Sequence, residues 1–163
     1  MARMSKTDRF TIISGSERET EGIGRAIGEA AFAGLVVALR GELGSGKTVL
    51  VRGLARGLGI DYAPITSPSF VIVNRYDGRL PLFHIDFYRL EHAVEAYELG
   101  LDEMASDGVV AIEWADRFAD VVPSEHIEID LEIAGETERR ITIAARGTGE
   151  REVLARVGAG SWR

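Results

Sequence analysis

The sequence contains no cysteine, which excludes disulfide bonds, iron–sulfur clusters, thiol catalysis and any disulfide-linked partner. It has only three histidines, widely spaced, and this argues against a structural zinc site. No apolar stretch approaches the roughly 20 residues that a membrane-spanning helix needs. Residues 1–9 carry positive charge with no hydrophobic core after them. We therefore expect that segment to be mobile rather than a secretory signal, and the protein to be cytoplasmic with no membrane partner.

The chain is acidic, with a formal net charge of −7 at pH 7. A protein that binds nucleic acid by itself usually presents a basic face, because much of the affinity comes from neutralising phosphates. Arg52 and Arg56 are one helical turn apart and Arg139 and Arg140 are adjacent, but we interpret both pairs as solvated surface charge. Any action on nucleic acid is therefore expected to run through a partner protein.

The length and composition are those of one globular domain. A chain of 163 residues buries about two thirds of the surface that its unfolded form exposes. An apolar content of 45% and a charged content of 28% are typical of a globular fold. We therefore expect residues 1–163 to form a single domain, in which the segment 147–163 shows no pattern that assigns it a role.

The segment 41–48 reads Gly-Glu-Leu-Gly-Ser-Gly-Lys-Thr and matches the phosphate-binding P-loop, G-x-x-x-x-G-K-[ST]. An apolar run at 35–39 leads into it as a buried strand, and a helical pattern leads out. Backbone N–H groups of such a loop and the helix N-terminus bind phosphate oxygens. Lys47 would reach the β- and γ-phosphates and the Thr48 hydroxyl would bind Mg²⁺. The sequence therefore predicts a nucleoside triphosphate site formed by Gly41, Glu42, Leu43, Gly44, Ser45, Gly46, Lys47 and Thr48.

Hydrophobic periodicity and turn signals give the order of the remaining elements. Ser16 and Glu19 form a capping box, which predicts that a helix begins there. The dipeptide Asp77-Gly78 predicts a hairpin turn. The predicted elements are a strand at 10–13, a helix from 16, a strand at 35–39, a helix ending near 57–59, strands at 71–76 and 80–86, a helix at 91–98, strands at 109–114 and 127–133, a pairing strand at 141–143 and a helix at 150–157. We expect a three-layer α/β, P-loop NTPase-like domain with a mixed, partly antiparallel sheet.

Two acids stand at the ends of apolar strands, where open α/β sheets bind their ligands. Asp86 follows residues 82–85, and Glu113 follows residues 109–112. Each matches a Walker B acid, and the sequence does not decide which one contacts Mg²⁺ directly. The alternative is that one of them caps a helix or pairs with an arginine. A cation between the two would offset the cost of burying them.

Three further features have two interpretations each. The loop Thr66–Ser69 lies where a switch loop would place a hydroxyl near Mg²⁺ or the γ-phosphate, or it is an ordinary connector. His84 stands among apolar residues, which favours a core histidine over a catalytic one. Trp114 either packs or contacts a partner.

The segment 74–77, Asn-Arg-Tyr-Asp, imitates a guanine-reading motif but precedes both acids, so we expect ATP as the nucleotide.

Several motifs together resemble the TsaE family, the small bacterial ATPases of tRNA threonylcarbamoyladenosine biosynthesis. Beside the P-loop they are, in order, Thr66–Phe70, His84–Leu90, Glu98–Glu103 and Ile112–Trp114. The resemblance covers residues 14–134, and Asp86–Leu90 and Ile112–Trp114 are its most specific parts. The chain departs from the family at Ser69, where threonine is common, and at 115–116, where Ala-Asp replaces Pro-Glu.

The resemblance implies an ATP hydrolase, slow without partners, that works with the TsaB and TsaD proteins and reaches tRNA only through them. It implies that Lys47 holds the phosphates and that Thr48 and Glu113 are ligands of Mg²⁺. Asp86 would be a second acid at the metal site, acting through water or on the attacking water. The family also contacts the nucleotide just before its first helix, which makes Glu17 a candidate contact here, and Trp114 and the Thr66 loop would respond to the nucleotide.

Two other functions stay open. A small-molecule kinase would use the same P-loop and Mg²⁺, but it needs an acceptor pocket and usually an arginine-bearing helical lid. From Pro123 on, the pattern is a strand hairpin that carries Arg139 and Arg140 at most. A nucleotide-gated binding module with negligible turnover would differ from the ATPase only in its rate.

Overall fold

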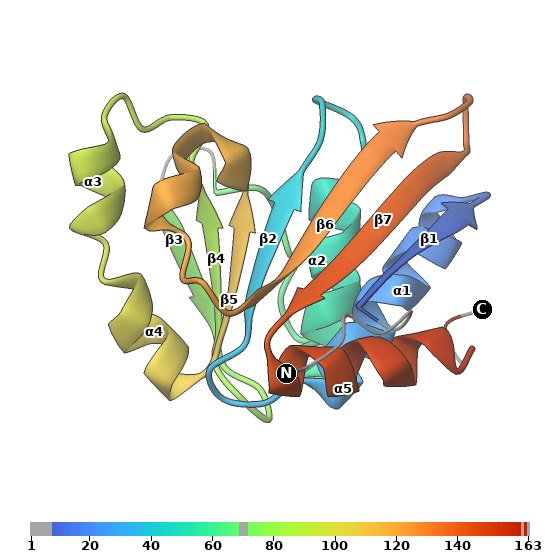
Figure 1. The fold of residues 1–163 in the computed structure, drawn as a ribbon, viewed down its shortest axis with the longest axis horizontal. Helices are drawn as coiled ribbons and strands as arrows, with labels where there is room; N and C mark the ends of the chain where they lie inside the picture. The colour runs from blue at the N-terminus through green and yellow to red at the C-terminus, as the bar shows by residue number, and fades with distance from the viewer. Residues whose placement is uncertain (1–7, 69–71, 161, 163) are drawn as a thin grey trace.

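The computed structural model describes residues 8–68, 72–160 and 162, and its centre is a seven-stranded mixed sheet (Figure 1). The strand order is β1-β7-β6-β2-β5-β4-β3. The central strand β2 pairs in parallel with β5 and β6, and β5 pairs in parallel with β4, whereas β1–β7, β6–β7 and β3–β4 are antiparallel. The strands are β1 (Arg9–Ser14), β2 (Val36–Arg40), β3 (Val73–Tyr76), β4 (Leu82–Asp86), β5 (Val109–Glu113), β6 (His126–Ile133) and β7 (Arg139–Arg146).

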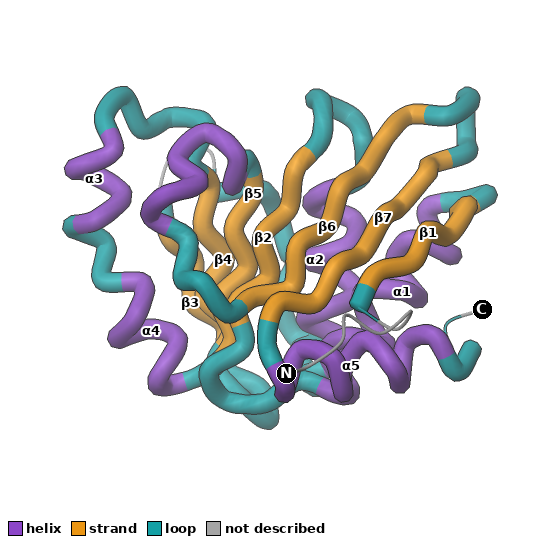
Figure 2. The backbone as a smooth tube through the Cα atoms, in the orientation of Figure 1, coloured by secondary structure: helices purple, strands orange, loops and turns teal. Residues whose placement is uncertain are grey.

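Helices cover the two faces of this sheet, which confirms the predicted three-layer α/β fold (Figure 2). They are α1 (Glu17–Ala30), α2 (Lys47–Gly57), α3 (Ala93–Tyr97), α4 (Leu101–Asp107), α5 (Thr148–Gly158) and the 3₁₀ helix η1 (Ala115–Val121). Alternate residues of β2 supply the two cores. Val37 and Leu39 pack with α1 and α2 on one face, and Val36 and Ala38 pack with α3, α4 and η1 on the other. Because both faces are covered, β2 and β5 are continuously apolar up to their ends, and the apolar run of β4 is interrupted only by His84.

The helices α1 and α2 touch backbone to backbone, through glycines that repeat at four-residue spacing. A Cβ atom at Gly53 would stand 1.9 Å from the carbonyl oxygen of Glu21, and one at Gly24 would stand 2.1 Å from that of Leu50. Gly28 and Gly57 meet in the same way one turn further on. This contact holds the N-terminus of α1 beside the start of α2, which is the end of the P-loop.

The predicted capping box begins α1. The Ser16 hydroxyl accepts a hydrogen bond from the N–H of Glu19 at 3.2 Å. The Glu19 carboxylate accepts from the N–H of Gly15 at 2.8 Å, one residue earlier than the usual pairing with the capping residue itself. The Ser14 and Thr20 hydroxyls are also hydrogen-bonded to each other, with their oxygens 2.7 Å apart. These bonds give the chain a defined path from β1 into α1.

The segment 87–122 is more helical than predicted. The helix expected at 91–98 is the shorter α3, and Gly100, at φ +74°, separates it from α4. Neither α4 nor η1 was predicted, because each is about seven residues long and covers too few turns to show a helical period. Among the described residues no helix is long and apolar enough to cross a membrane.

The remaining predictions differ from the structure only at their edges. The strand expected at 71–76 is observed from Val73, and residue 71 lies outside the described part, as do residues 1–7 of the expected mobile start. β4 begins after Pro81, which has no N–H to donate to a neighbouring strand. The strand β6 alternates buried and partly exposed residues, as predicted. The C-terminal segment forms α5, which packs against β7 and α1.

Candidate nucleotide site

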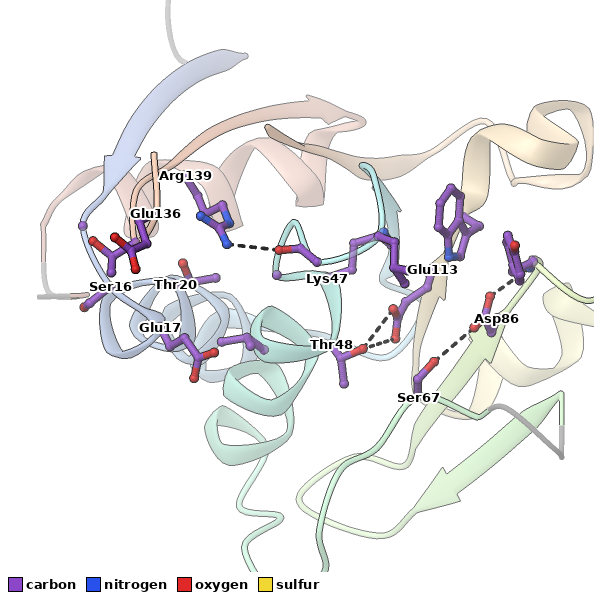
Figure 3. Close-up of a pocket in the computed structure, with 18 of the residues that line it drawn as sticks. Ser16, Glu17, Thr20, Lys47, Thr48, Ser67, Asp86, Glu113, Glu136 and Arg139 are labelled. Carbon is purple, nitrogen blue, oxygen red and sulfur yellow. Dashed lines mark hydrogen bonds between the residues drawn. The ribbon is translucent and has the colours of Figure 1, made fainter. Parts of the chain in front are cut away.

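A pocket of about 810 Å³ lies where the P-loop, the ends of β4 and β5, the start of α1 and the β6–β7 turn meet (Figure 3). This volume is within the usual range for a small-molecule site. The polar lining residues include Ser16, Glu17, Thr20, Lys47, Thr48, Ser67, Asp86, Arg89, Glu113, Glu136, Thr137 and Arg139. Segments far apart in the sequence therefore converge on the mouth of the P-loop.

The P-loop itself has the backbone of a phosphate cradle. Gly41, Gly44 and Gly46 all have positive φ, at +153°, +82° and +104°, a region that side chains disfavour. At Gly41 a Cβ would also stand 2.5 Å from the Ser45 hydroxyl. Gly46 begins α2 with no side chain of the described residues capping it, so the N–H groups of the first turn are available to an anion. The loop fits a phosphate group.

Lys47 is held against this loop. Its ammonium donates to the carbonyl oxygens of Gly41 at 2.6 Å and Glu42 at 2.9 Å, and lies 4.1 Å from the centroid of the Trp114 ring. Burial lowers the pKa of Lys47 from its ordinary value, while the nearby Glu113 and other acids act in the opposite direction. A partly desolvated cation attracts an anion more strongly than one in bulk water.

Thr48 and Glu113 form the centre of the site. The Thr48 hydroxyl donates to the Glu113 carboxylate, with distances of 3.0 Å to Oε1 and 3.1 Å to Oε2. Glu113 is the last residue of β5 and is only 3% exposed. Mg²⁺ prefers oxygen ligands, and in nucleotide sites it takes one or two from the protein and others from phosphates and water. The hydroxyl and the carboxylate fit such an ion.

Asp86 is adjacent to Glu113 because their strands are parallel and in register. The two residues are partners in the β4–β5 pairing, so their side chains lie on the same face. Asp86 Oδ2 accepts from the Ser67 hydroxyl at 3.1 Å, and Oδ1 accepts from the N–H of Tyr88 at 2.9 Å. The structure thus brings together the two acids that the sequence places 27 residues apart, and it holds one of them by a hydroxyl from the 66–69 loop (Figure 3).

The family follows from the whole chain as well as from this geometry. Residues 14–141 match the model of the family described as "Threonylcarbamoyl adenosine biosynthesis protein TsaE". The chain belongs to the TsaE family. The resemblance noted from the motifs is thereby confirmed, and with it a place among the proteins of tRNA threonylcarbamoyladenosine biosynthesis.

Relatives of this TsaE-family chain carry a matching description. It is 43% identical over 131 residues to the "tRNA threonylcarbamoyladenosine biosynthesis protein TsaE" of Bacillus subtilis, covering 79% of this chain and 81% of that one. It is 40% identical over 133 residues to the protein of that name from Treponema pallidum, covering 81% and 98%. The crystal structure of Bacillus subtilis YdiB superposes with a TM-score of 0.81 at 34% identity, over 97% of this chain and 98% of that one.

The TsaE-family chain does not bring every predicted site residue into the pocket. Leu43, Gly44, Gly46, Lys47, Thr48, Glu17, Asp86 and Glu113 line it. Thr66 is exposed and does not, and its neighbour Ser67 lines the pocket instead. Gly41 and Glu42 line a second hollow of about 410 Å³, between the end of β2 and the end of β6, and Ser45 is fully buried. The remaining hydroxyl of the loop, on Ser69, lies outside the described residues.

Other lining residues were missed from the sequence. Arg139, interpreted as solvated surface charge, instead donates from Nη2 to the carbonyl of Gly44 at 3.1 Å and so ties the β6–β7 turn to the P-loop. Thr20, Glu136 and Thr137 also line the pocket. No local motif marks these residues, because only the packing of α1 and the β6–β7 hairpin brings them to the P-loop. Nowhere in the described part of the chain, this pocket included, do three or more His, Asp or Glu side chains form a cluster that could hold a metal without other ligands.

Proposed function

We propose that this TsaE-family chain is a Mg²⁺-dependent ATPase that supports threonylcarbamoyladenosine modification of tRNA and acts with the TsaB and TsaD proteins. The observation that carries the proposal is the hydrogen bond between the Thr48 hydroxyl and the Glu113 carboxylate, next to a glycine-rich P-loop. As part of the same proposal the protein acts in the cytoplasm, where tRNA is available to the modifying enzymes.

The P-loop, the two acids and their neighbours each have a role in this chemistry. Backbone N–H groups of residues 44–48 and the Lys47 ammonium bind the phosphates, and Thr48 and Glu113 hold Mg²⁺. When bound, the ion neutralises charge on the phosphate oxygens. Asp86, oriented by Ser67 and by the N–H of Tyr88, faces the same pocket and orients the attacking water. Phosphoryl transfer depends mainly on such positioning and charge stabilisation.

The charge of the chain supports an indirect role at tRNA. With a net charge of −7 the protein repels a polyanion. Several of its arginine guanidinium groups already contact carboxylates or backbone carbonyls of the protein itself. The Arg56 guanidinium, for example, contacts Glu21, and that of Arg40 contacts Asp130 and Glu128. A shift of free tRNA by this protein alone in a gel at about 0.15 M salt would contradict this part of the proposal.

The deciding experiment measures Mg²⁺-dependent ATP hydrolysis by the protein alone and with purified TsaB and TsaD from the same source. We expect stimulation by the partners and its loss in Lys47→Ala, which removes the cation at the phosphates. The matched control is Arg52→Ala, which removes a charge from α2 outside the pocket and should leave hydrolysis unchanged. ADP formation that requires an added metabolite would instead indicate a kinase, and ATP binding without turnover in any mixture would indicate a binding module.

A further inference from the structure

A buried histidine stands directly behind Glu113. His84 lies in the middle of β4 with 0% of its side chain exposed, and its Nε2 is 2.5 Å from Glu113 Oε2. The carboxylate therefore has two neighbours, the Thr48 hydroxyl on the pocket side and the imidazole on the interior side. Both partners of this short contact are almost completely removed from water.

The direction of this hydrogen bond follows from its chemistry. A carboxylate only accepts, so Nε2 is the nitrogen that carries the hydrogen. The other ring nitrogen, Nδ1, is buried and has no hydrogen-bond partner among the residues described. A buried polar ring in an apolar layer costs free energy unless it is paired. Among the described residues, Glu113 is thus the hydrogen-bond partner that offsets the cost of burying this histidine.

The sheet register lets the ring reach Glu113. His84 is paired with Ala111 on β5, and Glu113 is two residues further on, on the same face. Ala111 carries only a methyl group and is fully buried, which leaves room for the imidazole to lie diagonally across it. A larger residue at 111 would occupy this path.

His84 does not line the nucleotide pocket, so it contacts neither nucleotide nor water there. Its hydrogen bond to Glu113 is the contact that links it to the site. We propose that His84 is a positioning residue that holds the Glu113 carboxylate, by a bond to Oε2, in the orientation that binds Mg²⁺. This inference rests on the proposed function, since it assumes that Glu113 is a metal ligand. Hydrogen-bond partners behind a ligand typically change metal affinity or activity by roughly 10- to 100-fold.

Two amide variants separate the hydrogen bond from the mere presence of a polar side chain. Glutamine places its amide nitrogen near the position of Nε2, whereas asparagine reaches only to the position of Nδ1. His84→Gln therefore keeps a donor to Glu113 and His84→Asn does not. His84→Met, of similar length but without a donor, replaces the asparagine variant if thermal melts show that the latter is unfolded at the assay temperature.

The measurement is calorimetric binding of ADP at a series of MgCl₂ concentrations and in EDTA. We expect His84→Asn to raise the half-saturating Mg²⁺ concentration roughly 10- to 100-fold, with ADP affinity in EDTA unchanged. His84→Gln should return it close to the wild-type value. Added to Glu113→Gln, His84→Asn should cause no further rise, because both changes act on the same ligand.

The outcomes are distinct. If His84→Asn melts at a lower temperature but needs no more Mg²⁺ than the wild type, the histidine is a structural core residue and the inference is wrong. A further rise in the double variant would also overturn it, because His84 would then act by another route. If the wild-type protein binds ADP without any dependence on Mg²⁺, it is the proposed function that fails, and this is visible before any variant is tested.

Discussion

The Lys47 ammonium lies against the face of Trp114, 4.1 Å from the ring centroid, while donating to two carbonyl oxygens of its own loop. Trp114 is the one non-glycine residue in the described part of the chain with positive φ, at +58°. Such a backbone costs about 1–3 kcal/mol for a bulky residue and persists only where its surroundings hold it. The Tyr88 ring also packs against the indole, tilted by 42° with the two ring centroids 5.0 Å apart. The Lys47 ammonium is therefore part of the immediate surroundings of the Trp114 indole.

We expect nucleotide binding to change the fluorescence of Trp114, because phosphates would draw the Lys47 ammonium away from the indole. Trp162→Phe leaves Trp114 as the only tryptophan, since the sequence has two. Titration of this variant with ADP and MgCl₂ should change the emission until it saturates, and Lys47→Met in the same background should give a flat titration. Binding seen by calorimetry without a change in emission would show that Lys47 keeps its contact with Trp114.

The two acids should be needed for hydrolysis more than for binding. In Glu113→Gln and Asp86→Asn we expect ADP affinity in EDTA to stay near the wild-type value, since neither acid binds phosphate directly. Hydrolysis should fall roughly a hundredfold or more, as the loss of several kcal/mol of stabilisation requires. The control is Asp107→Asn, an exposed acid at the end of α4. Normal hydrolysis by both site variants would place the catalytic centre elsewhere.

Gly53→Ala should destabilise the protein although alanine is the better helix former. In an open helix the exchange gains about 1 kcal/mol, but here the new Cβ would meet the Glu21 carbonyl oxygen at 1.9 Å. Overpacking of this kind costs about 1–3 kcal/mol, and each kcal/mol lowers the Tm of a protein of this size by about 2–4 °C.

Thermal unfolding followed by circular dichroism measures this effect. Gly135→Ala is the control, because its nearest neighbour, the Glu138 Cβ, is 3.5 Å away in the β6–β7 turn. An unchanged Tm for Gly53→Ala would mean that α1 moves away from α2 without cost. In that event ADP affinity should fall instead, since Glu17 and Thr20 of α1 line the pocket.

Glu150 should make stability depend on pH. It is 3% exposed at the start of α5, and burial raises the pKa of its carboxyl above the ordinary value of 4.5. A carboxyl whose pKa is higher in the folded state contributes its stability below the unfolded pKa and loses it as the pH rises through the folded pKa.

Urea unfolding from pH 4 to pH 8 tests this expectation. The free energy of unfolding of the wild type should fall relative to that of Glu150→Gln as the pH rises above about 4.5. Glu152→Gln, a change at an exposed position of the same helix, serves as the control and should show no such trend. A wild-type protein that gains stability over this range relative to Glu150→Gln would contradict the sign of the shift.

Local signals predicted the parts of the site that depend on neighbouring residues. The P-loop was recognisable because a glycine pattern, a lysine and a threonine must be contiguous to surround a phosphate. The capping box at Ser16 and Glu19 was recognisable for the same reason. The sequence also contains two pairs of glycines at four-residue spacing, Gly24 with Gly28 and Gly53 with Gly57. These pairs could have indicated the close contact between α1 and α2.

Long-range parts of the site had no such signal. The choice between Thr66 and Ser67 depends on the path of a loop without regular structure. The role of Arg139 depends on a hairpin that ends beside Gly44, 95 residues earlier in the chain. His84 was interpreted as a core histidine, and it is buried, but its partner proved to be the acid of the site.

The sequence by itself determined the family, the α/β class, the P-loop and the two acids at the strand ends, because each of these is written in contiguous residues or in a hydrophobic period. Only the tertiary structure decided which side chains meet. The parallel register of β4 and β5 places Asp86 beside Glu113, and it lets His84 reach Glu113 across Ala111. Registers and loop paths follow from the packing of the whole core, in which no short segment holds enough information to specify its distant partner.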